Sequence, residues 1–192
     1  MARQAVTFAN FFAESTACNF QLMKLTQFLT PDNIYHGVVI SSKKRALELI
    51  GKIVAEFINQ EIQPDTEQQL CPVECFTNLF KREKLGSTAL NYGVALPHAK
   101  LPACEFTLNS PIAIFLQLET PIDYEAQDHK EVDLIYALLF PENSCAQYKD
   151  GLADIAQALT DKNLLKHLRA AESAQDIWQI LTYADQQHEE HL

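Results

Sequence analysis

The segment from Val132 to Phe140 limits the fold more than any other part of the sequence, because Asp133 is its only charged residue. It is far shorter than the roughly 20 apolar residues that cross a membrane, and it has the length of a β-strand. A strand without polar alternation is covered on both of its faces. The sequence therefore predicts a sheet with helices packed on both sides.

Apolar residues at helical spacing predict the helices that could cover such a sheet. One helix starts after Ser41 or Ser42 as N-cap, and a second can begin at Pro72 and end before Gly86. A start resembling a capping box at Ser173 to Asp176 opens the last helix. The expected helices cover about Ser41 to Ile58, Pro72 to Lys84, Tyr148 to Thr160, Asn163 to Ala170 and Ala174 to Tyr183.

Short strands are expected between these two groups of helices, at Gly93 to Leu96 and at Ile112 to Leu118. Helices before, strands between and helices after indicate one α/β sandwich domain over residues 25–184. Residues 1–24 are interpreted as an N-terminal tail, within which Met23 is a possible alternative start. Residues 185–192 are expected to form a polar C-terminal tail.

The charge balance argues against several classes of partner. Fifteen Lys and Arg residues against 25 Asp and Glu residues give a formal net charge of −10. A surface of that sign repels nucleic acid and anionic lipid headgroups, and it suits a basic protein, or the basic patch of one, better.

Targeting signals and cysteine usage predict a cytoplasmic protein without direct membrane insertion. No apolar run is long enough to span a membrane, and residues after Phe12 match a signal-peptide cleavage site poorly. Five cysteines at irregular spacing suit reduced thiols. Cys71 and Cys75 lie one helical turn apart and could share a metal, but the lack of a second close pair favours ordinary buried thiols.

His98 is the most informative of the six histidines. Pro97, directly before it, cannot continue an interior ladder, so the ring is expected at the end of an apolar strand. Lys100 follows, and the upstream stretch from Arg82 to Thr88 offers a guanidinium and the hydroxyls of Ser87 and Thr88. These groups could stabilise a phosphoryl group in transfer. On these residues alone, a structural turn histidine is the more common explanation. The other five, at positions 36, 129, 167, 188 and 191, have no evident orienting partner nearby, and His36, which precedes Gly37, is expected in a turn.

Six segments together carry a family resemblance. Arg-Glu-Lys-Leu-Gly-Ser-Thr from Arg82, followed by Gly-Val-Ala-Leu-Pro-His ending at His98, resembles the active-site signature of the fructose/mannitol-type enzyme IIA domains of the bacterial phosphotransferase system. Within that family the chain is most similar to the nitrogen-related regulatory enzyme IIA. Supporting segments are residues 42–50, 117–122, 132–134 and 168–171, and all six run in family order.

The resemblance implies a mixed sheet between helices and a role for His98 as phosphoryl acceptor from a histidine-containing phosphocarrier protein. Arg82 then matches the family arginine beside the acceptor, with no metal and no cofactor. The resemblance also implies regulated targets such as potassium-transport regulators or sensor kinases.

Three positions depart from the family pattern. Tyr148 stands where the family has a second active-site histidine, and a phenol cannot share a proton near pH 7 as imidazole does. Ala99 follows the acceptor in place of glycine, and the loop Ala89 to Tyr92 replaces a more glycine-rich one. These departures leave an alternative open: an enzyme IIA-like binding module that has lost phosphoryl transfer.

Overall fold

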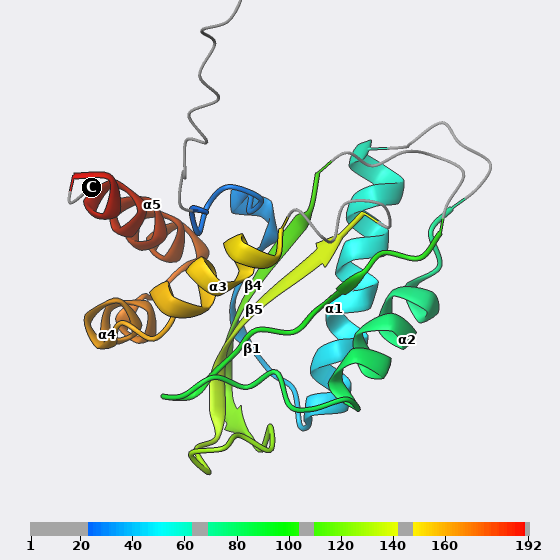
Figure 1. The fold of residues 1–192 in the computed structure, drawn as a ribbon, viewed down its shortest axis with the longest axis horizontal. Coiled ribbons are helices and arrows are strands. Elements are labelled where there is room, and N and C mark those ends of the chain that lie inside the picture. The colour runs from blue at the N-terminus through cyan, green and yellow to red at the C-terminus, as the bar shows by residue number, and fades with distance from the viewer. Residues whose placement is uncertain (1–22, 63–68, 104–109, 142–147, 191–192) are drawn as a thin grey trace, which may run out of the picture.

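The computed structural model describes residues 23–62, 69–103, 110–141 and 148–190, and it confirms an α/β sandwich built on a mixed sheet (Figure 1). The sheet has the strand order β1-β4-β5-β2, and β3 also pairs with β5. β4 and β5 are antiparallel, whereas β1 runs parallel to β4, and β2 and β3 run parallel to β5. The strands are β1 (Ile34–Val38), β2 (Val94–Ala95), β3 (His98–Lys100), β4 (Ile112–Ile122) and β5 (Val132–Phe140).

Helices cover both faces of the sheet, as the apolar segment requires. α1 and α2 lie on one face, and α3, α4 and α5 lie on the other (Figure 1). Their bounds are α1 (Lys43–Phe57), α2 (Pro72–Glu83), α3 (Lys149–Ala158), α4 (Lys162–Ala170) and α5 (Ala174–Glu190), with short turns η1 (Pro31–Asn33) and η2 (Ile58–Ile62).

Successive side chains of β5 enter two separate hydrophobic cores. Ile135, Ala137 and Leu139 pack with α1 and α2, whereas Tyr136 and Leu138 pack with the C-terminal helices. Because the side chains of a strand alternate between faces, full burial on both sides accounts for the missing polar alternation.

The helix starts follow the predicted caps. The Ser42 hydroxyl accepts a hydrogen bond from the Arg45 N–H at the start of α1. Before α5, the Asp176 N–H donates to the Ser173 hydroxyl, and that hydroxyl in turn donates to the Asp176 carboxylate. The Asp176 carboxylate also accepts from the Glu172 N–H at 3.2 Å, so the start resembles a capping box in which the acidic residue reaches back one residue further than usual.

Two expectations about the chain's elements were wrong. Residues 34–38 were not expected to form a strand, because His36 and Gly37 indicated a turn. Gly37 does have a positive φ of 66°, yet pairing with β4 holds the segment in the sheet, where His36 Nε2 lies 3.1 Å from the Ala171 carbonyl oxygen. The last helix was expected to end at Tyr183, but it continues to Glu190.

Asp185 explains the longer helix. Its buried carboxylate accepts hydrogen bonds from the N–H groups of Leu25 and Thr26, at 2.7 and 2.9 Å. Residue 185 is therefore an internal contact of the domain rather than part of a solvated tail. The domain limits at residues 25 and 184 stay a prediction.

Candidate functional site

His98 is the first residue of β3, the strand that continues the sheet edge begun by β2. Pro97 separates these two strands and has no N–H to donate to a ladder. The break leaves the carbonyl of Leu96 outside the two strands, within reach of the His98 ring.

Two hydrogen bonds define the tautomer of His98. Its Nδ1 lies 2.9 Å from the Leu96 carbonyl oxygen, which can only accept, so Nδ1 carries the hydrogen. Its Nε2 lies 3.1 Å from Arg82 Nε, which can only donate, so Nε2 presents its lone pair. The ring is therefore a neutral imidazole whose basic nitrogen faces a guanidinium.

Burial also favours the neutral form of the His98 ring. Desolvation lowers the pKa of His98 below its ordinary value of 6.5, and the nearby positive charge of Arg82 lowers it further. The Leu96 hydrogen bond and the carboxylate of Glu83 oppose these effects in part. The net direction keeps the ring neutral, and thus nucleophilic, at neutral pH.

Arg82 extends from helix α2 to the ring of His98. It lies in the last turn of α2, in the layer formed by α1 and α2, and its Nη1 donates to the Gly86 carbonyl at 3.1 Å. Gly86 lies three residues after the last residue of α2 and has a positive φ of 151°. The guanidinium is thus held by one acceptor on its own loop and by the imidazole.

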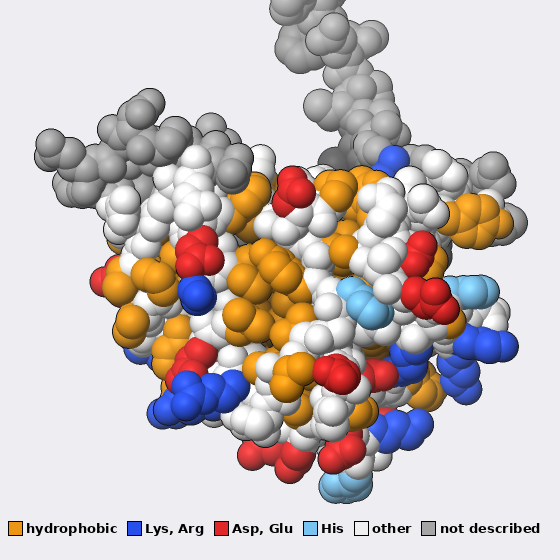
Figure 2. All heavy atoms as spheres, turned by 180° about the vertical axis from the view of Figure 1, so that it is seen from behind, with side chains coloured by type: hydrophobic (Ala, Val, Ile, Leu, Met, Phe, Trp, Pro, Cys, Tyr) orange, Lys and Arg blue, Asp and Glu red, His pale blue; other side chains and the backbone are white. Residues whose placement is uncertain are grey.

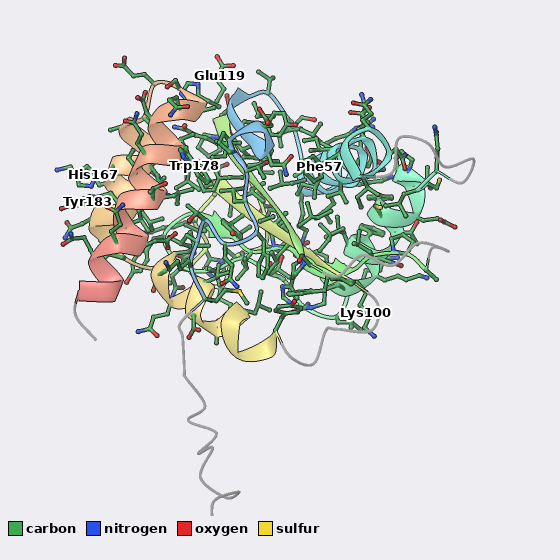
Figure 3. The ribbon with its side chains drawn as sticks, turned by 90° about the horizontal axis from the view of Figure 1, so that it is seen from above. Phe57, Lys100, Glu119, His167, Trp178 and Tyr183 are labelled. Carbon is green, nitrogen blue, oxygen red and sulfur yellow. The ribbon has the colours of Figure 1, made fainter. Side chains whose placement is uncertain are left out.

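A surface groove of about 780 Å³ opens over this pair. Lys100, two residues beyond His98 on the same face of β3, lies along the groove and points outward at the edge of the molecule (Figure 3). Tyr148 lines the same groove, and its ring stacks on Phe140 at a centroid distance of 5.7 Å and meets Phe28 edge-on at 5.5 Å. The structure therefore brings His98, Arg82, Lys100 and Tyr148 together at one groove.

Ser87 and Thr88 are placed differently. The Ser87 hydroxyl donates to the Tyr124 carbonyl at 2.9 Å, and the buried Thr88 hydroxyl donates to Glu83 at 2.6 Å. Neither residue is among those that line the groove. Their hydroxyls hold the loop after α2 in place instead of facing His98.

Glu83 is the supporting residue that the sequence reasoning missed. Its buried carboxylate accepts hydrogen bonds from the Thr88 N–H and hydroxyl and lies 3.4 Å from Lys43 Nζ. The Thr88 carbonyl in turn accepts from the N–H of Leu96, the residue that binds the His98 ring. A signal was present: Cys75, Leu79 and Glu83 follow each other at four-residue intervals on the buried face of α2.

Other candidate features are less suited to chemistry. Cys71 is exposed and Cys75 is buried, and no group of three or more His, Cys, Asp or Glu residues in the described ranges could hold a metal ion. A second groove, of about 850 Å³, lies between α4 and α5 and contains His167. His167 and Tyr183 lie far from Lys100 in Figure 3. No described helix has both the length and the apolar character of a membrane span.

The fold and the groove define a class of protein: an α/β sandwich that presents one neutral histidine beside an arginine at a sheet edge. Residues 27–184 match the family model described as "Phosphoenolpyruvate-dependent sugar phosphotransferase system, EIIA 2". A "Nitrogen regulatory protein homolog" from Haemophilus influenzae is 49% identical over 164 residues, which cover 85% of this chain and 94% of that protein.

Solved structures agree with the match. The nitrogen regulatory protein IIA-Ntr of Neisseria meningitidis superposes with a TM-score of 0.69 at 30% identity, covering 82% of this chain and 98% of that one. The mannitol IIA of Escherichia coli, at 18% identity and a TM-score of 0.59, shares the fold over 79% of this chain and 97% of that one. The chain belongs to the type-2 enzyme IIA family of the phosphoenolpyruvate-dependent phosphotransferase system, and its relatives include nitrogen regulatory proteins.

Proposed function

We propose that this protein accepts a phosphoryl group on His98 from a histidine-containing phosphocarrier protein and regulates partner proteins through its phosphorylation state. The observation that carries the proposal is the pair of hydrogen bonds that leaves Nε2 of a neutral ring facing Arg82 in an open groove. The names of the relatives support the regulatory half of the proposal.

The proposed reaction exchanges one P–N bond for another. Nε2 of His98 attacks the phosphorus, the P–N bond to the donor histidine breaks, and the donor ring leaves with its electron pair as a neutral imidazole. His98 keeps the hydrogen on Nδ1, and the Leu96 carbonyl stabilises the positive charge that the ring gains. Arg82 turns from Nε2 to the phosphoryl oxygens, for which its planar donors are well suited.

No proton has to leave or enter the acceptor ring in this scheme. A second histidine is thus not needed to balance the step, and Tyr148 in its place is compatible with transfer. The phenol ring packs between Phe28 and Phe140 and lines the groove. We infer that it shapes the donor's approach rather than moving a proton.

We propose that the reaction takes place in the cytoplasm, where the cysteines would stay reduced. The proposed regulated targets are those implied by the family resemblance, namely potassium-transport regulators or sensor kinases. A phosphoryl group adds about −1.5 to −2 charge, so a target surface near His98 would sense it strongly.

The first test is the phosphoryl adduct itself. The full-length protein is incubated with phosphoenolpyruvate and the purified general phosphotransferase proteins, and intact mass is recorded before and after acid treatment. One acid-labile phosphoryl group is expected on the wild type and none on His98→Ala. If the donor is demonstrably phosphorylated and the wild type stays unmodified, the binding-module alternative is correct.

Tyr148→His tests whether the second position is catalytic. We expect a single adduct on His98 and a change in rate of no more than about tenfold, because the step has no proton to relay. Rapid-quench measurement of phosphorylation rates compares the variant with the wild type and with Tyr148→Phe. A gain of about 100-fold or more in Tyr148→His, with Tyr148→Phe unchanged, would contradict the role assigned to the phenol.

A further inference from the structure

The charge of the His98 groove is opposite to that of the whole chain. Four cations line it, and no Asp or Glu is among the described residues that do so, although the sequence has 25 acidic and only 15 basic residues. The four cationic residues, here called the basic rim, are Lys81, Arg82, Lys84 and Lys100.

The basic rim has no carboxylate partner among the residues that the structure describes. Within the described ranges no residue of the rim forms an ion pair, and the three lysines are exposed. Several cations elsewhere are paired with carboxylates, among them Arg45 with Glu48 and Arg169 with Asp133. On the face shown in Figure 2, acidic and basic side chains lie next to one another. Charges of one sign without a carboxylate partner repel each other, and their field remains available to a ligand.

An exposed apolar side chain lies within the rim. Leu85, between Lys84 and Gly86, is 85% exposed, and it is among the residues that line the groove. A largely exposed leucine among cations has the composition of a small docking surface, with an apolar contact and polar surroundings.

A single phosphoryl group on His98 does not require all four cations of the basic rim. Arg82 already contacts the His98 ring, and its fork of donors can hold the phosphoryl oxygens. The exposed lysines extend along α2 and β3 and widen the positive field beyond one phosphoryl group. An extended field of this kind serves the encounter of two protein surfaces.

We propose that the basic rim and Leu85 dock a protein whose contact face is acidic and offers Leu85 an apolar pocket, and that this partner is the phosphoryl donor. The inference rests on the proposed function for the identity of the partner. It reverses the expectation from net charge, which favoured a basic partner, because association is governed by the charge at the contact rather than by the sum over the chain.

Charge reversal on α2 tests the docking surface. Phosphorylation of Lys81→Glu/Lys84→Glu is followed against the concentration of phosphorylated donor at low and high ionic strength. The KM for the donor is expected to rise about tenfold or more at low salt, with kcat within about twofold of wild type and with the salt dependence lost. The KM of Lys81→Gln/Lys84→Gln should lie between those of the wild type and the charge-reversed variant.

Matched controls separate docking from general effects of charge and exposure. Lys166→Glu reverses one charge, as each of the two substitutions on α2 does, at an exposed lysine of α4 in the layer on the other face of the sheet, and it should leave KM unchanged. Leu85→Ser should raise KM, whereas Val73→Ser, at the 65%-exposed Val73 at the start of α2, should not.

Two results would overturn the docking proposal while leaving phosphorylation intact. One is an unchanged or lower KM in the charge-reversed variant. The other is a fall in kcat at unchanged KM, which would assign the lysines to the phosphoryl group itself.

If the wild type accepts no phosphoryl group, the proposed function fails, and docking is then measured by calorimetric titration with unphosphorylated donor. Binding that charge reversal abolishes supports the acidic-partner proposal, and binding that it leaves intact, or no binding, refutes it.

Discussion

The two nitrogens of His98 differ because their neighbours differ in kind. A carbonyl oxygen faces Nδ1 and a guanidinium faces Nε2, so the ring holds one tautomer and leaves one nitrogen as the nucleophile. Sequence reasoning could place the imidazole near Arg82 from the family motif. It could not show that the carbonyl of Leu96 turns toward the ring.

A pH profile tests the charge state of His98. Burial lowers the pKa of the ring below 6.5, so more than half of the molecules are neutral at pH 6.5 and the neutral fraction increases as the pH rises. The phosphorylation rate is expected to rise by less than about twofold above pH 6.5 and to fall more steeply at more acidic pH. The ring signals of His98, followed by NMR, should titrate below the ordinary histidine pKa of 6.5. A rate that declines as the pH falls from 8 to 7, with a donor shown to be pH-independent there, would contradict this assignment.

At the scale of elements, α2 carries Arg82 and must sit close to α1. Gly51 permits this contact: a Cβ at this position would lie 2.7 Å from the Phe76 backbone nitrogen and 3.0 Å from the Pro72 carbonyl oxygen. Backbone atoms cannot move aside as a flexible side chain can. The distance between these helices therefore depends on the absence of one methyl group.

Gly51→Ala tests this helix contact. Alanine improves helix propensity by about 1 kcal/mol, but the clash with α2 is expected to cost about 1–3 kcal/mol and to displace Arg82 as well. We expect a lower free energy of unfolding in urea and a slower phosphorylation of His98. Lys52→Ala, at the neighbouring exposed position, should change stability by no more than about 0.5 kcal/mol. A Gly51→Ala protein more stable than wild type would show that α2 is free to shift.

At the scale of the whole molecule, Leu25 and Thr26, near the start of the described chain, are held by the last helix. The Asp185 carboxylate accepts from the Leu25 and Thr26 N–H groups and from the Thr26 hydroxyl at 2.6 Å. These contacts join segments about 160 residues apart, as the separation between Leu25 and Asp185 shows. The segment from Leu25 also closes the core, because the buried Tyr136 hydroxyl of β5 donates to the Leu25 carbonyl.

Asp185→Ala should therefore destabilise the whole domain. Each buried group left without a partner costs about 1–3 kcal/mol, so the loss is expected to reach at least about 2 kcal/mol. Asp185→Asn keeps one acceptor oxygen, so its stability should lie between those of Asp185→Ala and the wild type. Chemical denaturation followed by circular dichroism measures both, with Asp32→Ala at an exposed position as control. An Asp185→Ala protein with wild-type stability would mean that the residues from Leu25 onward are not part of the cooperative unit.

The sequence by itself determined what depends on near neighbours in the chain. The apolar run of β5 predicted a sheet covered on both faces, helical spacing and caps located α1, α2 and α5, and the motif around Arg82 and His98 indicated the family. Periodicity and capping act over a few residues, so they can be read from the chain directly.

Only the tertiary structure decided features that depend on distant partners. Pairing with β4 makes a strand of the segment with His36 and Gly37, and Leu25 and Thr26 keep Asp185 inside the domain. The basic rim arises because α2 and β3 bring cations from separate segments to one groove, whereas net charge sums all residues without regard to position. Hydrogen bonds and electrostatic fields depend on distances in space, and those distances are set only when the layers pack.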